Sequence, residues 1–129
     1  YIVQSAVSLS FKLNISKFNT YGSNMIEKTE IKNENNTNIE KINSIKIDDI
    51  FFDKKISFMK IDVQGYDLEV LKGSKKTIIK QQMPIIFEYE EDFAKDFNYT
   101  FKNFESFINE INYKISIQID KSNYLILPK

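Results

Sequence analysis

The sequence of 129 residues contains no cysteine, no histidine and no arginine. Without cysteine and histidine, a disulfide framework, a thiolate nucleophile, a Ser-His-Asp triad and a zinc or other histidine-ligated metal site are excluded. Without arginine, every basic residue is a lysine, and a bidentate guanidinium clamp on phosphate or carboxylate groups is excluded as well. The chemistry of any site is therefore left to carboxylates, lysines, tyrosines, hydroxyls and amides.

Surplus charge and long apolar runs are also missing. The 18 basic and 18 acidic residues give a formal net charge of zero. This balance argues against nucleic acid or an anionic membrane as a partner, since both require an excess of positive charge on one face. No segment approaches the roughly 20 apolar residues of a membrane span. The lack of cysteine fits a reducing compartment, and a cytoplasmic location is expected.

What the sequence does contain is enough apolar material for one core. Hydrophobic residues make up 42% of the chain and aromatic residues 14%, which argues against wholesale disorder. The length suits one domain. The opening Tyr1-Ile2-Val3 is typical of the interior of a strand and predicts a piece of a longer protein, so residues 1–129 are expected to form a single, partial domain.

The first third of the chain carries weak signals. Residues 1–9 and 11–18 resemble strands, the second by alternation of apolar and polar residues. Residues 27–44 are rich in Glu, Lys and Asn and predict a solvated loop or an edge hairpin. Asp48 or Asp49 is predicted to cap a short turn of helix.

The middle of the chain predicts a strand, a helix and a parallel strand. Residues 56–63 form a nearly continuous apolar run, as expected for a strand buried on both faces. Helical spacing follows over about 66–80, where Ser74 is positioned to cap the second part of the helix. A second short apolar run, 84–88, completes a βαβ unit.

The last third predicts a helix and a hairpin. Alternating apolar residues mark 114–120 as a half-buried strand, and a turn leads into an antiparallel partner at 123–127. The preceding helix is marked by Phe101, Phe104, Phe107, Ile108 and Ile111. The predicted fold class is therefore α/β, with a mixed sheet that ends in an antiparallel C-terminal hairpin.

Polar residues at the ends of the two parallel strands are the candidates for a site. Ligands of open α/β sheets bind beyond the carboxyl ends of the strands, where the sequence places Asp62, Gln64 and Gly65 after one strand and Glu88 at the end of the next. Each has a structural alternative. Asp62 is equally suited to capping the following helix, and Gly65 to a tight turn.

The neighbouring residues also leave alternatives open. Tyr66 and Asp67 stand at the expected start of the helix, where backbone amides point outward. Tyr66 is suited to packing against a ligand or in the core. Lys60, inside the apolar run, is predicted to extend its ammonium group to solvent or to pair with an acid.

Residues 56–73, Ile-Ser-Phe-Met-Lys-Ile-Asp-Val-Gln-Gly-Tyr-Asp-Leu-Glu-Val-Leu-Lys-Gly, resemble the signature of the FkbM methyltransferases. That signature is a hydrophobic strand, Lys-Ile-Asp-Val-Glu-Gly, an aromatic or small residue, Glu, and a helix ending in Val-Leu-Lys-Gly. Residues 47–50 and 84–88 are similar to the family as well. Two positions depart from it: Gln64 replaces the usual glutamate, and Asp67 replaces the second glutamate.

The resemblance implies an incomplete Rossmann-like class I methyltransferase sheet and S-adenosylmethionine as cofactor. It implies methyl transfer, with oxygen the expected methyl-accepting atom, and a small molecule or glycan as acceptor. Asp62 is expected to orient the acceptor or to take its proton, with Glu88 second, and no metal is expected. The residues expected to bind substrate or cofactor are Gln64, Gly65, Tyr66, Asp67 and Ala6.

The resemblance also implies what is missing. Class I methyltransferases hold the cofactor on a glycine-rich turn and on an acid that grips the ribose, whereas this chain has only Gly22, Gly65 and Gly73. The chain is therefore expected to be the carboxy-terminal half of such a domain and to bind the cofactor weakly or not at all. An exposed sheet edge would favour self-association. The alternatives are a non-catalytic or partner-binding remnant and an accessory protein of glycan synthesis.

Overall fold

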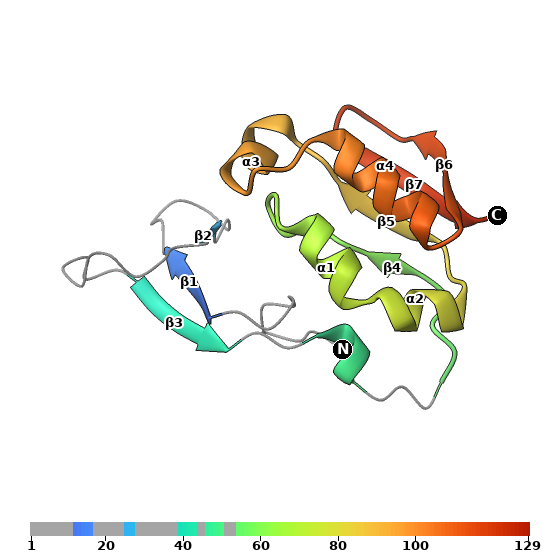
Figure 1. The fold of residues 1–129 in the computed structure, drawn as a ribbon, viewed down its shortest axis with the longest axis horizontal. Coiled ribbons are helices and arrows are strands. Elements are labelled where there is room, and N and C mark those ends of the chain that lie inside the picture. Colours follow the sequence, from blue (N-terminus) through green and yellow to red (C-terminus); the bar gives the residue numbers. More distant parts are fainter. Residues whose placement is uncertain (1–11, 17–24, 28–38, 44–45, 51–53) are drawn as a thin grey trace.

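The computed structural model describes residues 12–16, 25–27, 39–43, 46–50 and 54–129 (Figure 1). The first three ranges are antiparallel strands in which β1 (Lys12–Ser16) pairs with both β2 (Met25–Glu27) and β3 (Ile39–Asn43). This confirms a strand within 11–18. The region 27–44, predicted as a solvated loop or an edge hairpin, contributes β3, which pairs with β1 and not with β2, and residues 28–38 lie outside the described residues. The predicted strand at 1–9 lies outside the described residues.

A mixed four-stranded sheet carries the rest of the fold. Its order is β4-β5-β7-β6, in which β4 and β5 are parallel and the other two pairings are antiparallel. The predicted parallel pair and C-terminal hairpin are thus confirmed. The strands are β4 (Met59–Lys60), β5 (Ile85–Glu88), β6 (Tyr113–Gln118) and β7 (Asn123–Pro128).

Helices connect the strands, and those of residues 67–81 and 101–110 lie over one side of this sheet (Figure 1). The predicted helix between β4 and β5 is confirmed as two consecutive helices, and the helix before β6 is confirmed as one. A single turn of 3-10 helix precedes β4. The helices are η1 (Ile47–Asp49), α1 (Asp67–Gly73), α2 (Lys75–Gln81), α3 (Glu91–Asp96) and α4 (Phe101–Glu110).

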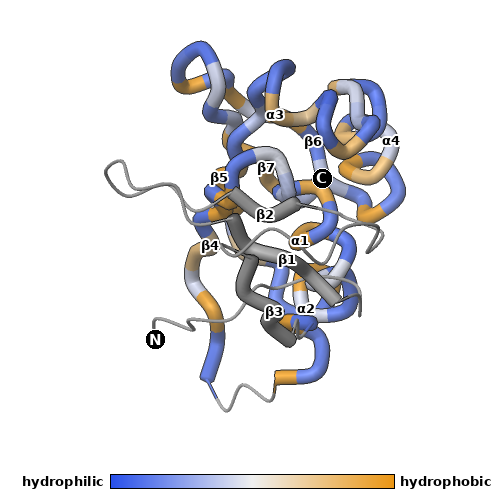
Figure 2. Tube along the Cα trace, turned by 90° about the vertical axis from the view of Figure 1, so that its left-hand side faces the viewer, coloured by the Kyte–Doolittle hydropathy of each residue, from blue (hydrophilic) through white to orange (hydrophobic). Residues whose placement is uncertain are grey.

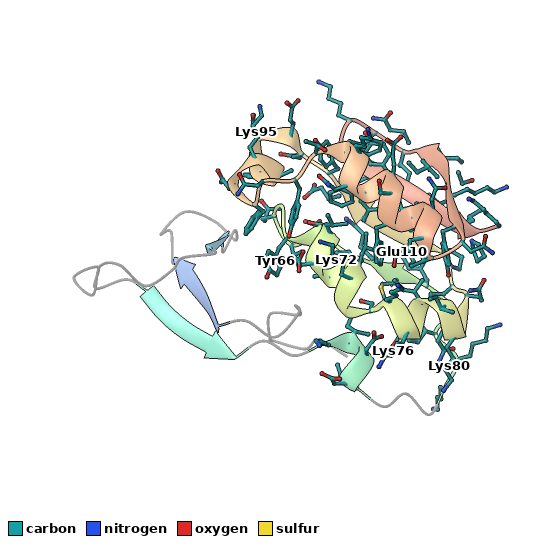
Figure 3. All side chains as sticks on the ribbon, in the orientation of Figure 1. Tyr66, Lys72, Lys76, Lys80, Lys95 and Glu110 are labelled. Atoms are coloured by element: carbon teal, nitrogen blue, oxygen red, sulfur yellow. The ribbon has the colours of Figure 1, made fainter. Side chains whose placement is uncertain are left out.

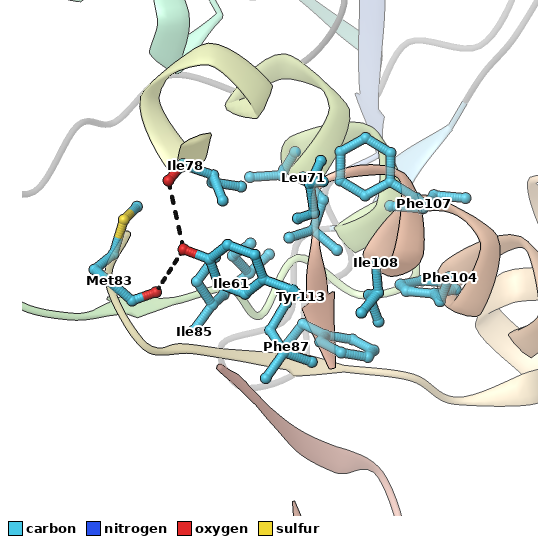
Figure 4. Close-up of a cluster of buried hydrophobic side chains, with 14 residues drawn as sticks. Ile61, Leu71, Ile78, Met83, Ile85, Phe87, Phe104, Phe107, Ile108 and Tyr113 are labelled. Atoms are coloured by element: carbon cyan, nitrogen blue, oxygen red, sulfur yellow. Dashed lines mark hydrogen bonds between the residues drawn. The ribbon is translucent and has the colours of Figure 1, made fainter. Parts of the chain in front are cut away.

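The core lies between these helices and the sheet (Figure 4). Hydrophobic and hydrophilic residues alternate along α4 (Figure 2), whose buried side consists of Phe104, Phe107 and Ile108. Ile85 and Phe87 of β5 are fully buried, and the Phe87 ring stacks on Phe104 of α4 with centroids 5.1 Å apart. The single proton of the Tyr113 hydroxyl is shared between the carbonyls of Met83 (3.1 Å) and Ile78 (3.4 Å).

The first parallel strand is shorter and more exposed than the sequence predicts. The ladder with β5 covers Met59 and Lys60, and one further N–H bond from Ile61 to Ile86 extends it. Phe58 is 50% exposed and Lys60 is exposed too. The prediction of a strand over 56–63 buried on both faces is therefore wrong in length and burial, because the helices described here cover one face of the sheet.

A bulge changes the pattern of β6. Ile115 pairs with Ile126, but Ile117 pairs with Leu125, so the register shifts between Ile115 and Ile117. An extra residue in one strand turns the following side chains to the opposite face. Ile117 and Ile119 are consequently 56% and 50% exposed, and the prediction that they share a buried face with Ile115 is wrong.

The cap of α2 comes from a distant residue. Ser74 precedes α2, but its hydroxyl donates to the carbonyl of Val70 and caps no N–H group of the helix. The carboxylate of Asp48 instead accepts the N–H groups of Lys76 (3.0 Å) and Thr77 (2.8 Å). The predicted cap by Ser74 is wrong because its hydroxyl is buried between α1 and α2, while Asp48 does cap a helix, though one far along the chain.

None of the helices among the described residues is long and apolar enough to cross a bilayer.

Replacing Tyr113 with phenylalanine should lower the free energy of unfolding by about 1–2 kcal/mol, because the carbonyls of Met83 and Ile78 lose their buried donor. Urea unfolding followed by circular dichroism measures the change. Tyr124→Phe is the control, since the Tyr124 ring stacks on Phe87 of the same core while its hydroxyl makes no hydrogen bond with the described residues. Equal effects of both substitutions would contradict the assignment.

Candidate active site

The ends of β4 and β5 bring two acids to one edge of the sheet. Because the two strands are parallel and adjacent, their carboxyl ends point the same way. Asp62 follows β4 by two residues, and Glu88 is the last residue of β5. The predicted proximity of Asp62, Gln64 and Glu88 is confirmed by direct hydrogen bonds among their side chains.

A tight turn places Gln64 beside Asp62 and Glu88. Gln64 and Gly65 both have positive φ, 52° and 92°, and the N–H of Tyr66 donates to the carbonyl of Val63 at 3.3 Å. Two consecutive positive φ values are characteristic of a type I′ turn. Glutamine adopts this left-handed conformation less readily than glycine or asparagine, so the backbone of Gln64 is strained where its side chain meets the site.

The amide of Gln64 joins the two carboxylates. Its Nε2 donates to Oδ1 of Asp62 at 3.3 Å and to Oε2 of Glu88 at 3.4 Å. An amide NH₂ group has two donors, and both are engaged here. Gln64 therefore bridges the ends of two neighbouring strands and holds their acids at a fixed separation.

A lysine lies on the other oxygen of Asp62. The ammonium group of Lys60 donates to Oδ2 of Asp62 at 3.2 Å, to Oδ1 of Asn123 at 3.1 Å and to the carbonyl of Ile61 at 3.3 Å. This confirms the predicted pairing of Lys60 with an acid. The side chains of the ion pair are 41% and 48% exposed, so the pair contributes little to stability but sets the charge at the edge.

The environment separates the pKa values of the two acids. Burial alone would raise the pKa of Asp62, but the hydrogen bond and the charge of Lys60 outweigh it and hold this pKa below its ordinary value. Burial and the charge of Asp62 raise the pKa of Glu88 to about 7. At neutral pH the two acids thus differ in protonation: Asp62 is ionised, and Glu88 is near the midpoint of its titration.

Asp67 lies beneath this pair. It is fully buried, and its Oδ1 accepts the backbone N–H of Glu88 at 3.2 Å. Burial raises the pKa of Asp67 to about 6, and the charge of Asp62 adds to this shift. Its Oδ2 is buried and has no hydrogen-bond partner among the described residues. Asp67 therefore ties the start of α1 to the end of β5, close to Asp62 and Glu88.

The other predicted site residues lie in different surroundings. A Cβ atom on Gly65 would lie 2.8 Å from both the Cβ and the carbonyl oxygen of Phe93, so the close approach at this glycine is to the chain itself. Tyr66 is buried edge-on to Phe97, with centroids 5.1 Å apart, which is the core-packing alternative. Ala6 lies outside the described residues.

Two features were not predicted as parts of a site. Asn123 reaches Lys60 from β7, whereas residues 123–127 were predicted only as a strand of the C-terminal hairpin. Beside α1, the half-buried hydroxyl of Tyr99 donates to the buried carboxylate of Glu69, which also pairs with Lys72 at 2.8 Å. An acid on the apolar side of a helix was the available sequence signal for Glu69.

Among the described residues, no group of three or more acidic side chains is placed to hold a metal ion. A cavity of about 290 Å³ lies elsewhere, between η1 and α2, lined by Asp48, Asp49, Lys76 and Lys80 among others. Lys76 and Lys80 project from α2 in Figure 3.

Residues 3–115 match the family model described as the Methyltransferase FkbM domain. Neither the comparison with curated proteins nor the comparison with solved structures gave a match. The matched range covers most of the chain and includes Asp62, Gln64 and Glu88, the residues that meet at the edge of the sheet.

Replacing Gly65 with alanine should lower the free energy of unfolding by roughly 1–3 kcal/mol. Alanine is strained at a φ of 92°, and its Cβ would meet the backbone of Phe93, which cannot rotate away. Gln82→Gly tests the opposite case: at φ 52° on the surface, glycine relieves strain and should change stability by less than about 1 kcal/mol. A tolerated Gly65→Ala would show that the turn relaxes.

Replacing Asp67 with asparagine should flatten the dependence of stability on pH. The unfolded carboxyl releases its proton near pH 4, whereas the folded one keeps it up to about pH 6. The folded state thus binds more protons in this range, and wild-type stability falls as pH rises through it, by up to about 3 kcal/mol.

Urea unfolding at pH 4.5 and pH 7.5 measures this difference for the wild type, for Asp67→Asn and for Asp92→Asn, a control at an exposed acid of α3. The control should keep the wild-type slope. Part of the slope should also persist in Asp67→Asn, because the raised pKa of Glu88 acts in the same direction. An unchanged slope in Asp67→Asn would show that the buried carboxyl does not titrate in this range.

Proposed function

Because this chain belongs to the FkbM methyltransferase family, we propose that it serves in S-adenosylmethionine-dependent methyl transfer to a hydroxyl group of a small molecule or glycan. The observation that carries the proposal is the meeting of Asp62, Gln64 and Glu88 at the carboxyl ends of two parallel strands. The mixed α/β sheet, with helices on one side, is consistent with part of a class I, Rossmann-like methyltransferase fold.

The two acids are suited to different tasks in this reaction. Methyl transfer to oxygen requires that the hydroxyl be aligned and that its proton leave as the new bond forms. Glu88, with a pKa of about 7, can take a proton at neutral pH. Asp62 stays charged, paired with Lys60, and holds the amide of Gln64 that also meets Glu88. This reverses the expected order, in which Asp62 was the first candidate for the proton.

Gln64 keeps the two tasks separate. Its amide occupies one oxygen of each acid, which leaves Oε1 of Glu88 for an acceptor, while Lys60 occupies the second oxygen of Asp62. The acceptor hydroxyl would donate to Glu88, whose carboxylate would receive the proton as the hydroxyl oxygen takes the methyl group and the broken C–S bond leaves its electron pair on the sulfur. Positioning then supplies much of the rate, because the displacement is in line.

The described residues suit the reacting end of the cofactor better than its nucleoside. When bound, S-adenosylmethionine supplies a methyl group on a positively charged sulfur, and an edge with the exposed Asp62 and the part-buried Glu88 favours a nearby cation. The sequence has only three glycines and no glycine-rich turn, which such folds use against the phosphate or nucleoside part of a ligand. We therefore expect the 129 residues alone to bind the cofactor weakly.

The same shortage of glycine favours a second candidate, a non-catalytic remnant that binds a partner. In that case the acids at the edge have no reaction to serve. The two candidates differ in one measurable property, since an enzyme needs Glu88 to titrate during turnover and a remnant does not.

Methyl transfer should be measured as release of S-adenosylhomocysteine, by mass spectrometry, from the protein as its gene encodes it, with pools of hydroxylated small molecules and glycans. Turnover should rise as pH increases through about 7, as Glu88 loses its proton. Glu88→Gln should lower turnover by about 10²-fold or more and remove this rise. Asp62→Asn should lower turnover far more than it lowers stability.

Glu91→Gln is the matched control, because Glu91 is an exposed acid on α3 paired with Lys95, and it should leave turnover unchanged. Calorimetric titration with the cofactor completes the design. Low-micromolar binding by the 129-residue chain would overturn the expectation of weak binding. No cofactor binding and no turnover by the encoded protein would reject the enzyme in favour of the remnant.

A further inference from the structure

The ammonium group of Lys60 is fully engaged. It has three donors and no acceptor, and its three neighbours are the carboxylate of Asp62, the side-chain carbonyl of Asn123 and the backbone carbonyl of Ile61. Lys60 belongs to β4 and Asn123 to β7, with β5 between them in the sheet. The lysine side chain therefore crosses β5 to reach Asn123. Its contacts thus extend beyond a single surface ion pair.

Asn123 is itself held in one orientation. Its Nδ2 donates to both carboxylate oxygens of Asp120, at 3.0 Å each. Oδ1 of Asp120 also accepts the backbone N–H groups of Ser122 (2.9 Å) and Asn123 (2.8 Å). With its NH₂ group fixed on Asp120, the amide of Asn123 must present its oxygen to Lys60. The turn between β6 and β7 thus determines that Lys60 meets the side-chain oxygen of Asn123.

We propose that Lys60 is a positioning residue: anchored by Asn123, it fixes the Asp62 carboxylate in the orientation in which Gln64 joins it to Glu88. The proposal rests on the proposed function for its catalytic consequence, but the positioning itself needs no cofactor. A chain of side chains, Asp120, Asn123, Lys60, Asp62, Gln64 and Glu88, then connects the C-terminal hairpin with the reacting edge.

The charges around the pair determine how the loss of Lys60 would act. Asp62 has three charged neighbours: Lys60 of β4, Glu88 of β5 and Asp67 of α1. Glu88 faces Asp62, Asp67 and also Glu90. Among the described residues, Lys60 is the cation in contact with this group of acids. Removing its charge should therefore raise the pH of both titration steps of the pair, and that of Asp62 most.

The test follows the side-chain carboxyl carbons of Asp62 and Glu88 by ¹³C NMR between pH 2 and pH 9, without cofactor. Lys60→Met, which keeps the length of the side chain and removes its charge, should raise the Asp62 step by about one pH unit. Lys60→Arg should restore most of the wild-type titration. Asn123→Ala should shift the Asp62 step in the same direction as Lys60→Met, by a smaller amount, because the lysine loses its anchor.

Lys95→Met is the control for the loss of one surface lysine. Lys95 lies on α3 in an exposed ion pair with Glu91 (Figure 3), and its loss should leave both titrations unchanged. Thermal unfolding verifies that each variant is folded. The proposal would be overturned if the Asp62 titration were the same in Lys60→Met and in wild type. It would also be overturned if Lys95→Met shifted the Asp62 titration as much as Lys60→Met does.

Turnover separates this proposal from the proposed function. If the encoded protein transfers methyl groups, the rise in turnover near pH 7 should move to higher pH in Lys60→Met and return in Lys60→Arg; an unmoved rise would overturn the positioning role. If the protein transfers none, the proposed function fails by itself, and the NMR titration still decides whether Lys60 positions Asp62.

Discussion

The meeting of the two strand ends depends on one part-buried hydrogen bond, from the backbone N–H of Glu88 to the carboxylate of Asp67. It ties the first turn of α1 to the last residue of β5, and so sets the distance between the turn after β4 and the end of the neighbouring strand. Burial of a carboxylate is unfavourable unless it is well paired, and the pKa of Asp67, raised to about 6, expresses that penalty. The fold accepts the penalty at the point where two strand ends must stay together.

The buried Asp67 also affects the pKa values of the acids at the edge of the sheet. A carboxyl group that is buried below Asp62 and Glu88 adds negative charge to their surroundings, and this charge contributes to the raised pKa of Glu88. Lys60 acts on the other side by stabilising the charged form of Asp62. Two acids that would be alike in water are thereby separated, one charged and one near its titration midpoint at neutral pH. Differences of this kind between neighbouring acids are typical of catalytic sites.

The meeting of Asp62, Gln64 and Glu88 could be predicted from the sequence because it follows from topology: adjacent parallel strands end at one edge. Contacts that depend on the register between strands could not be predicted in this way. Asn123 reaches Lys60 because β7 pairs with β5 so that Asn123 lies opposite Glu88, and nothing in the local pattern of 120–123 fixes that alignment. The bulge in β6 and the cap from Asp48 are likewise set by tertiary packing. Gly65 was predicted at a turn, but its neighbour Phe93 was not.

Gln64 shows how backbone and site requirements combine. Its turn alone would favour glycine or asparagine, since φ is 52°, yet the side chain that stands there donates to two acids. A glutamate, the residue usual in the family signature, would place another carboxylate against Asp62 and Glu88 and would have to share their proton to avoid repulsion. The amide removes that conflict, because it donates to both acids whatever the protonation of Glu88. In this chain the strain of the turn and the spacing of the acids are therefore consequences of one side chain.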